Sequence, residues 1–203
     1  MGNNSVKLTD NRKEYKSVYQ LKPNIVIINE IPDLNFLVIE NEGRRDDLVR
    51  DEPSLIWLFS RIQNQLRIIT SKRMQYNFRL MPFEMIWQDQ LPDGIWKRVV
   101  MVQVPEQIDQ LLVEEAIHNV RIKNKGVEFL VPSFRRVSQG LCAHTLHLGH
   151  YDEIANTEDH IIKTVSSQGF RSRGKTREIY MNPPTWNPVE KWQTIVRIPI
   201  EKI

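Results

Sequence analysis

Met81-Pro82-Phe83-Glu84-Met85-Ile86-Trp87 and Arg177-Glu178-Ile179-Tyr180-Met181 are two short segments that lie far apart in the sequence and share one character. Each has the composition of a β-strand and carries one carboxylate among aromatic and aliphatic residues. A charge among side chains that favour burial costs free energy unless the protein uses the charge at that place. The two segments therefore predict a pocket that both strands help to line.

The composition is that of an ordinary globular protein. The chain has 203 residues, of which 40% are hydrophobic and 26% charged, enough for one domain of good size or two small fused domains. The single cysteine, Cys142, excludes an internal disulfide framework and a cysteine-rich zinc site. The five histidines match no metalloenzyme spacing, so we expect neither a metal nor another cofactor.

The charge pattern argues against nucleic acid and membranes as partners. The net charge is +3, but 25 acidic residues are interleaved with 28 basic ones, whereas a nucleic-acid-binding face needs clustered basic residues. No run approaches the roughly eighteen apolar residues of a membrane span, and the first residues lack the apolar core of a signal peptide. We therefore expect a cytoplasmic protein.

The first half of the chain combines strands with one helix. Residues 1–23 are polar, and we expect them to form a loosely attached arm. Strand-like residues fill 24–40, and a helix is predicted at 52–71, where apolar residues step by four and three along one face. Strands at 76–87 and 96–104 follow, separated by a Pro-Asp-Gly turn.

The second half repeats this order. A connecting helix is predicted at 105–122, where Pro105 suits the first turn. The elements after it are strands near 127–137 and 141–148, a helix near 152–167, and strands at 176–181 and 192–200. We expect Gln139-Gly140 to join the first two of these strands as a hairpin.

This recurrence predicts an α+β fold built as a tandem repeat of two small units. We expect two antiparallel sheets side by side, with the helices on one face. Repeat one spans about 24–104, the linker helix about 105–122 and repeat two about 127–203. The alternative is one continuous sheet without internal symmetry, because the identity between the halves is too low to prove a duplication.

Several motifs occur in an order typical of a known family. The second half contains Leu146-His147-Leu148-Gly149-His150-Tyr151-Asp152-Glu153, the segment from Arg177 to Pro183, and the segment from Pro188 to Arg197. The first half contains Asn35 to Gly43, Met81 to Trp87 and Leu111 to Ile117. From about Lys13 onward the chain resembles the GyrI-like (gyrase-inhibitor-like) small-molecule-binding domain family. It is most similar to the stand-alone branch that includes cyclopropanoid cyclopropyl hydrolases.

The resemblance implies two SHS2-like units over residues 24–203, with a groove at their junction that is lined by aromatics and holds a carboxylate. Relatives sense or sequester amphipathic, often cationic or aromatic compounds, and some resemble hydrolases that open the ring of DNA-alkylating cyclopropanoid natural products. The chain departs from the family pattern at Met85 (glycine in the family), at His150 (proline) and in the loop 182–185. We expect Met85 to narrow or reshape the groove.

Glu178 and Tyr180 are the predicted catalytic residues. They are two positions apart, so on a strand they share one face, while Ile179 and Met181 share the other. Either the polar and aromatic face lines the groove, or it is a solvated face on which Glu178 pairs with a Lys or Arg. The family resemblance favours the groove.

Glu84 and Trp87 are predicted ligand contacts from the other strand. They are three positions apart, so a regular strand sends them to opposite faces, and only a bulge or a strand end brings both into one pocket. The alternative is that Trp87 belongs to the core and Glu84 to the surface.

Four more residues complete the predicted ligand site. Trp57 lies beside the apolar stripe of the first helix and Trp96 opens a strand, so each is a core residue or a groove wall that can bind a cation through its ring. His147 and Tyr151 flank Gly149, where the second repeat passes from strand to helix. A histidine there either makes structural hydrogen bonds or contacts the ligand.

These residues, together with the family resemblance, imply two functions of different classes. In the first, the protein is a hydrolase of strained, electrophilic aromatic compounds, with Glu178 as general base and Tyr180 positioning the water or the developing oxyanion. In the second, it binds amphipathic compounds as a sensor or sequestering protein, with Glu178 as counter-charge and no turnover. A role as a protein partner, for example of gyrase, is a weaker third possibility.

Overall fold

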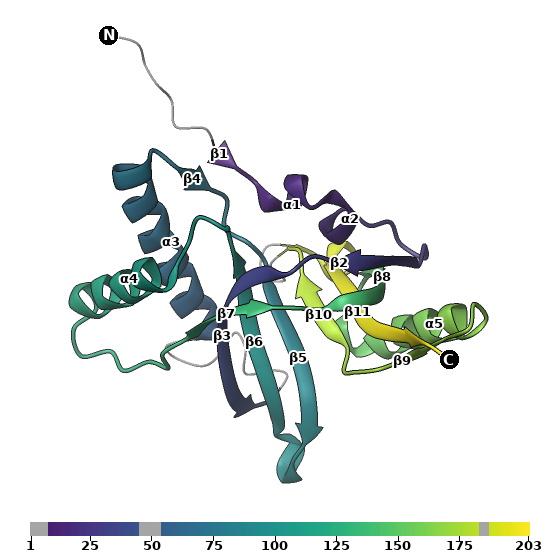
Figure 1. Ribbon diagram of the computed structural model, residues 1–203. Coiled ribbons are helices and arrows are strands. Elements are labelled where there is room, and N and C mark those ends of the chain that lie inside the picture. The colour runs from purple at the N-terminus through teal and green to yellow at the C-terminus, as the bar shows by residue number, and fades with distance from the viewer. Residues whose placement is uncertain (1–7, 45–53, 183–186) are drawn as a thin grey trace.

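The computed structural model describes residues 8–44, 54–182 and 187–203 (Figure 1). The α-helices are α1 (Asn11–Glu14), α2 (Lys16–Tyr19), α3 (Leu55–Met74), α4 (Gln110–Lys123) and α5 (Ile154–Ser166). The strands are β1 (Leu8–Thr9), β2 (Ile27–Ile31), β3 (Leu34–Gly43), β4 (Asn77–Phe78), β5 (Phe83–Gln90), β6 (Trp96–Val104), β7 (Ser133–Val137), β8 (Gly140–Leu148), β9 (Phe170–Ser172), β10 (Arg177–Tyr180) and β11 (Gln193–Lys202). Short 3-10 helices are η2 (Pro92–Gly94), η3 (Tyr151–Glu153) and η5 (Val189–Lys191).

The main sheet is antiparallel and curled. Its order is β2-β8-β11-β10-β5-β6-β3-β7, with β9 paired to β11 beside this path, and a separate parallel pair joins β1 to β4. The order is symmetric about the β5–β10 pair. Outward from this pair, one half continues with β6 and β3, and the other continues with β11 and β8. The predicted arrangement of two sheets side by side is thus corrected, since the β5–β10 ladder joins the halves into one sheet.

Two short strands are exchanged between the halves. β2 opens the first repeat but pairs with β8 of the second, and β7 opens the second repeat but pairs with β3 of the first. The predicted hairpin at Gln139-Gly140 is therefore wrong, because the strands on its two sides belong to different ladders. Each exchanged strand covers the outer edge of a longer one and so satisfies backbone groups that an open edge would expose.

The sheet curls so strongly that its two ends approach each other. Only residues 32–33 separate β2 at one edge from β3 near the other, a gap of about 10 Å at most for an extended chain. The guanidinium carbon of Arg177 lies 5.5 Å from the ring centre of Phe36, although β5 and β6 lie between their strands. Neighbouring strands are about 4.8 Å apart, so a flat sheet would hold these groups too far apart. Arg177 and Phe36 therefore lie on the concave face.

Helices α3 and α5 pack on the opposite side of the sheet, which we call the helix face. Ser54 begins α3 by accepting a hydrogen bond from the Trp57 backbone N–H at 3.1 Å. The buried stripe of α3 includes Phe59 and Ile62, and the Phe59 ring lies 5.9 Å from that of Phe83 on β5. α5 covers β8 and β11 through a second apolar cluster, while α4 packs on α3. The sheet thus separates two differently covered faces.

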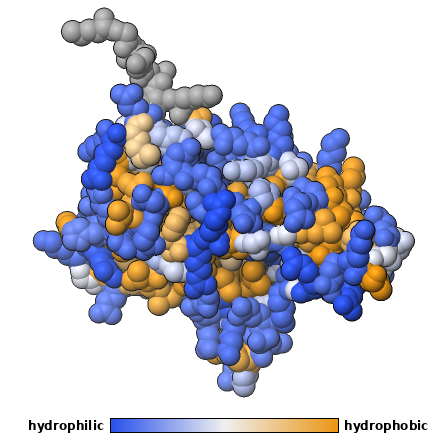
Figure 2. Space-filling view, viewed as in Figure 1, coloured by the Kyte–Doolittle hydropathy of each residue, from blue (hydrophilic) through white to orange (hydrophobic). Residues whose placement is uncertain are grey.

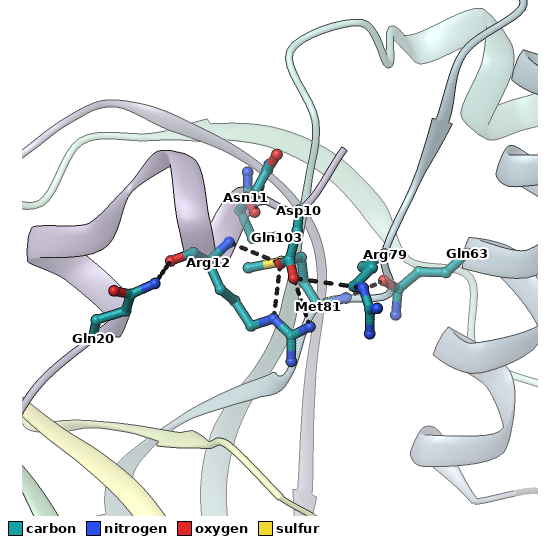
Figure 3. Close-up of polar contacts among 8 residues, drawn as sticks. All are labelled: Asp10, Asn11, Arg12, Gln20, Gln63, Arg79, Met81 and Gln103. Atoms are coloured by element: carbon teal, nitrogen blue, oxygen red, sulfur yellow. Dashed lines mark hydrogen bonds and ion pairs between the residues drawn. The ribbon is translucent and has the colours of Figure 1, made fainter. Parts of the chain in front are cut away.

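The N-terminal arm packs against the concave face, which corrects the expectation of a loosely attached segment. Tyr19 is buried, and its hydroxyl donates a hydrogen bond of 3.2 Å to Glu84. Figure 3 shows polar contacts of the arm, in which Asn11 also takes part. Asn11 Nδ2 donates a hydrogen bond of 3.0 Å to Gln103 Oε1. By strand register, Glu84 and Gln103 share the face of Phe36. The arm therefore covers part of the inside of the curl.

Polar groups dominate the outer surface. Figure 2 shows hydrophilic residues over most of the visible side, with apolar patches between them. Exposed ion pairs of opposite sign, such as Arg73 with Glu115 and Arg171 with Glu201, agree with the interleaved charges of the sequence. Among the described helices, none is both long and apolar enough to cross a membrane.

Candidate functional site

Glu178 lies on the helix face in the middle of the sheet. Its neighbour Arg177 points to the concave face, so Glu178 points the other way. It stands directly opposite Met85 on β5 and Val196 on β11. Only 2% of Glu178 is exposed, and its Oε2 accepts a hydrogen bond of 2.6 Å from the Tyr180 hydroxyl. The prediction that these two side chains share a face is confirmed.

A row of aromatic rings crosses the helix face beside this carboxylate. Phe83 and Tyr180 stand directly opposite each other in the β5–β10 ladder, and Phe83 contacts Phe59 of α3. The Tyr180 ring meets Tyr151 edge to face at 5.3 Å, and Tyr151 stacks on Trp192 at 4.9 Å. The row runs from α3 to η3 and offers the flat, apolar surfaces that bind aromatic compounds.

The Tyr151 hydroxyl keeps its proton over the whole physiological range. Burial raises the pKa of Tyr151 to about 12, and the negative charge of Glu178 adds to the shift. Tyr151 is therefore a hydrogen-bond donor at neutral pH. Together with the Tyr180 hydroxyl, it gives the surroundings of Glu178 two phenol groups that can hold a water or an oxygen atom of a ligand.

The family of the chain follows from comparison with known proteins. A family model described as the GyrI-like small molecule binding domain matches residues 25–201. The chain belongs to this family. The match spans both repeats and contains Glu178 and the whole aromatic row. No curated protein matches the chain significantly.

Solved structures share the fold of this GyrI-like domain. A hydrolase from Listeria innocua has a TM-score of 0.84 and 23% identity, covering 96% of this chain and 100% of that chain. An uncharacterized conserved protein from Listeria innocua has a TM-score of 0.84 and 22% identity, with coverages of 95% and 100%. The C-terminal domain of EcmrR has a TM-score of 0.50 and 17% identity, with coverages of 88% and 98%. At these identities the likeness establishes the fold alone.

His147 of this GyrI-like domain is held by structural hydrogen bonds. Its Nδ1 lies 2.8 Å from Thr157 Oγ1 on α5, and its Nε2 lies 3.0 Å from the His150 carbonyl oxygen. The side chain is only 6% exposed. These contacts fix the segment that presents Tyr151, so His147 positions a member of the aromatic row. They favour the structural alternative of the sequence prediction.

The three predicted tryptophans lie in two different places. Trp87 is on the helix face, where its ring meets Trp96 edge to face at 6.2 Å. The register irregularity of β5 comes after Trp87, so no bulge brings Glu84 to the same face. Trp57 instead contacts the ring of Phe129, 6.4 Å away in the segment after α4. Trp87 and Trp96 therefore extend the site region along β5 and β6, and Trp57 packs toward α4.

The structure separates Glu84 from Glu178, contrary to the prediction of one pocket lined by both. Glu84 stands directly opposite Ile179, so it points to the concave face, where it is fully buried. Its Oε2 accepts a hydrogen bond of 2.9 Å from Arg177 Nη1, and its Oε1 accepts the bond from Tyr19. The charge that the sequence singled out is therefore used in a buried ion pair.

Three rings of the aromatic row are absent from the predicted site: Phe59, Phe83 and Trp192. The period of two identifies Phe83, because it lies two positions before Met85 and shares its face. No local sequence pattern identifies Phe59 and Trp192, because only the packing of α3 and the segment that leads into β11 place them in the row. Met85 stands directly opposite Glu178, so the departure from the family glycine falls inside the site.

The groups available at this site are one carboxylate, phenol hydroxyls and aromatic faces. Within the ranges that the structure describes, no three or more His, Cys, Asp and Glu side chains gather in a way that would hold a metal ion. These groups suit an organic ligand with aromatic character and a group that a carboxylate recognises.

Proposed function

We propose that this protein binds amphipathic aromatic compounds, including cationic ones, in a groove on the helix face where the two repeats meet. The observation that carries this proposal is the buried carboxylate of Glu178 beside the contacting rings of Tyr180, Tyr151 and Trp192. Aromatic faces bind planar ligands by stacking, and a buried carboxylate is stabilised by a cationic partner or by hydrogen-bond donors. Membership of a small-molecule-binding family supports the same conclusion.

We propose further that the bound compound is hydrolysed when it carries a strained, electrophilic cyclopropane ring. Glu178 accepts a proton from a water molecule, and the water oxygen forms a bond to a ring carbon. The ring C–C bond breaks, and its electron pair moves into the conjugated carbonyl, whose oxygen then takes up the proton. Tyr180 and Tyr151 are placed to orient the water or stabilise that oxygen, because both hydroxyls are near Glu178.

Binding without turnover is the second function. Here Glu178 is a counter-charge, and the aromatic row sequesters or senses a cation. The hydrogen bond of 2.6 Å from Tyr180 favours the hydrolase, because it fixes the carboxylate in one orientation as a base requires. A hydrolase from Listeria innocua with the same fold is a further reason to test turnover first.

The test is Glu178→Gln, which keeps the shape and removes the charge. Purified wild type and variant are incubated with cyclopropanoid compounds and with cationic aromatic dyes, products are identified by mass spectrometry, and affinity is measured by calorimetry. The matched control is Glu201→Gln, which removes an exposed carboxylate paired with Arg171.

The outcomes separate the two functions. For a general base, turnover falls by about 10² to 10⁴ while affinity for the compound survives. For a counter-charge, wild type shows no turnover and the variant loses affinity for cationic dyes but not for neutral aromatics. Wild-type turnover and affinity in Glu178→Gln would remove this carboxylate from the site.

A further inference from the structure

A cavity lies on the concave face of the sheet, inside the curl. It has a volume of about 170 Å³ and is floored by β5, β8, β10 and β11, with the β7–β8 turn and the β9–β10 loop as walls. Its floor includes Arg177, which points to the concave face. The lining residues that matter here are Gln139, Cys142, Arg173, Lys175, Arg177 and Arg197.

The cavity carries an excess of positive charge. Arg173, Lys175, Arg177 and Arg197 line it, and none of its lining residues that the structure describes is acidic. Outside the lining, the Glu84 carboxylate pairs with Arg177, and Asp89 lies 3.5 Å from the Lys175 ammonium. Glu30 is close to Arg173 at the start of β8, because both side chains approach Gly140. Two of the four cations are thus neutralised by direct ion pairs and the lining stays cationic.

Arg197 is the least compensated of the four. Its side chain is 1% exposed, and its guanidinium donates to three neutral acceptors: His144 Nδ1 at 3.3 Å, Gln139 Oε1 at 3.0 Å and the Val18 carbonyl at 2.9 Å. Burial lowers the pKa of Arg197, and the Glu84 carboxylate acts against that shift, although Glu84 forms its direct ion pair with Arg177. A buried charge whose direct hydrogen-bond partners are neutral costs free energy. An anion in the adjoining cavity would offset that cost.

Gln139 gives a second, independent indication. It is 6% exposed, and its Oε1 is occupied by Arg197, but its Nε2 is buried and has no hydrogen-bond partner in the described structure. A buried donor without an acceptor costs about 1 to 3 kcal/mol. Gln139 is one of the residues that line the cavity, so an acceptor that reached Nε2 from there would satisfy the donor. An anionic oxygen in the cavity would therefore both offset the charge of Arg197 and accept a hydrogen bond from Gln139.

We propose that this cavity binds a small tetrahedral oxyanion, inorganic phosphate or a single phosphate group. Guanidinium groups match phosphate oxygens in geometry as well as in charge, and three of the four cations here are arginines. The volume is below the 300 Å³ or so at which pockets for whole drug-sized molecules begin, which favours one anionic group. The site lies on the concave face, so this proposal does not rest on the function assigned to the helix face.

The test is calorimetric titration of the full chain with inorganic phosphate, in buffers matched for ionic strength with chloride. Parallel titration with glycerol 3-phosphate distinguishes a free ion from a phosphate group on a larger molecule. The variant is Arg173→Gln with Lys175→Gln, which changes two exposed residues of the β9–β10 loop. The matched control is Arg171→Gln with Lys163→Gln, which removes the same net charge outside the cavity lining.

We expect saturable one-to-one binding by wild type and by the control, and an affinity lower by about tenfold or more in the Arg173/Lys175 variant. Gln139→Glu places a carboxylate where the anion would sit, so it should weaken phosphate binding by a similar factor and raise the melting temperature in phosphate-free buffer. Absence of saturable binding to wild type, or equal loss in variant and control, would overturn the proposal. Unchanged phosphate affinity in Gln139→Glu would overturn it as well.

Discussion

Glu84 and Glu178 are carboxylates on neighbouring strands, yet they differ in almost every respect that bears on function. One step of register separates them across the β5–β10 ladder, where Glu84 faces Ile179 and Glu178 faces Met85. That step sends Glu84 to the concave face, into contact with Arg177 and Tyr19, and Glu178 to the helix face among phenols and aromatic rings. The period of two along a strand thus decides which carboxylate pairs with Arg177 and which lies beside the aromatic rings.

The concave face holds the buried ion pair of Glu84 with Arg177, and the N-terminal arm covers it through Tyr19. Taking two charges out of water is costly, so a buried pair such as Glu84–Arg177 persists only when both partners remain. On the helix face, the Glu178 carboxylate lies at the junction of the two halves, next to the partly buried rings of Tyr180 and Tyr151. We therefore expect substitutions on the concave face to change stability and substitutions on the helix face to change ligand binding.

Glu84→Gln should have the largest effect on stability. It leaves the Arg177 guanidinium buried without its counter-charge, and breaking a buried pair in this way costs about 3 to 5 kcal/mol. Urea unfolding at pH 7 measures the loss, with Glu178→Gln as the paired variant on the helix face. Glu84→Leu combined with Arg177→Met removes both charges and should recover most of the stability. A Glu84→Gln protein as stable as Glu178→Gln would contradict the structural assignment.

The elements were largely predictable because they depend on local patterns. The strand expected at 96–104 is β6 with the same bounds, and the helix expected at 52–71 is α3, shifted by three residues. The shared face of Glu178 and Tyr180 follows from the same local periodicity and was also predictable. In each case the spacing of apolar and polar residues along one segment contains the information.

Strand pairing and the role of Glu84 were not predictable in this way. A period of two says that two side chains share a face but not which face, and it does not name the neighbouring strand. The exchange of β2 and β7 between the halves, the joining of the sheet at β5–β10 and the docking of the arm are all long-range contacts. Only those contacts bring Arg177 and Tyr19 to Glu84 and turn an apparent pocket residue into a buried ion pair.

His144, on the concave face, should make stability depend on pH in the acid range. Burial lowers its pKa from the usual 6.5 to about 3, and the positive charge of Arg197 adds to the shift. Below pH 6.5 His144 is protonated in the unfolded chain, but in the folded chain it stays neutral until the pH nears 3. Stability therefore falls as the pH falls from 6.5 towards 3. The loss between pH 6.5 and 5 should be about 2 kcal/mol.

Urea unfolding of His144→Gln at the same two pH values checks this prediction. The variant has no imidazole to protonate, so it should lose about 2 kcal/mol less than wild type over that interval. His118→Gln, which replaces an exposed histidine of α4, is the control and should behave like wild type. An identical pH dependence in wild type and His144→Gln would show that other buried groups control the acid response.

Tyr180→Phe removes the hydroxyl that donates to Glu178, and Tyr19→Phe removes the one that donates to Glu84. These two variants should show the smallest difference between the helix face and the concave face. Tyr19 is 3% exposed and its bond to Glu84 is sealed by the arm, so its loss should cost about 1 to 3 kcal/mol and lower the melting temperature by several degrees. Tyr180 is only partly buried, so its loss should cost about 1 kcal/mol or less while ligand affinity or turnover falls. Calorimetric melting and ligand titration of the two variants separate these effects. If Tyr180→Phe proved the less stable variant and kept full ligand affinity, its tyrosine would be a structural anchor, and the distinction between the two faces would fail at its centre.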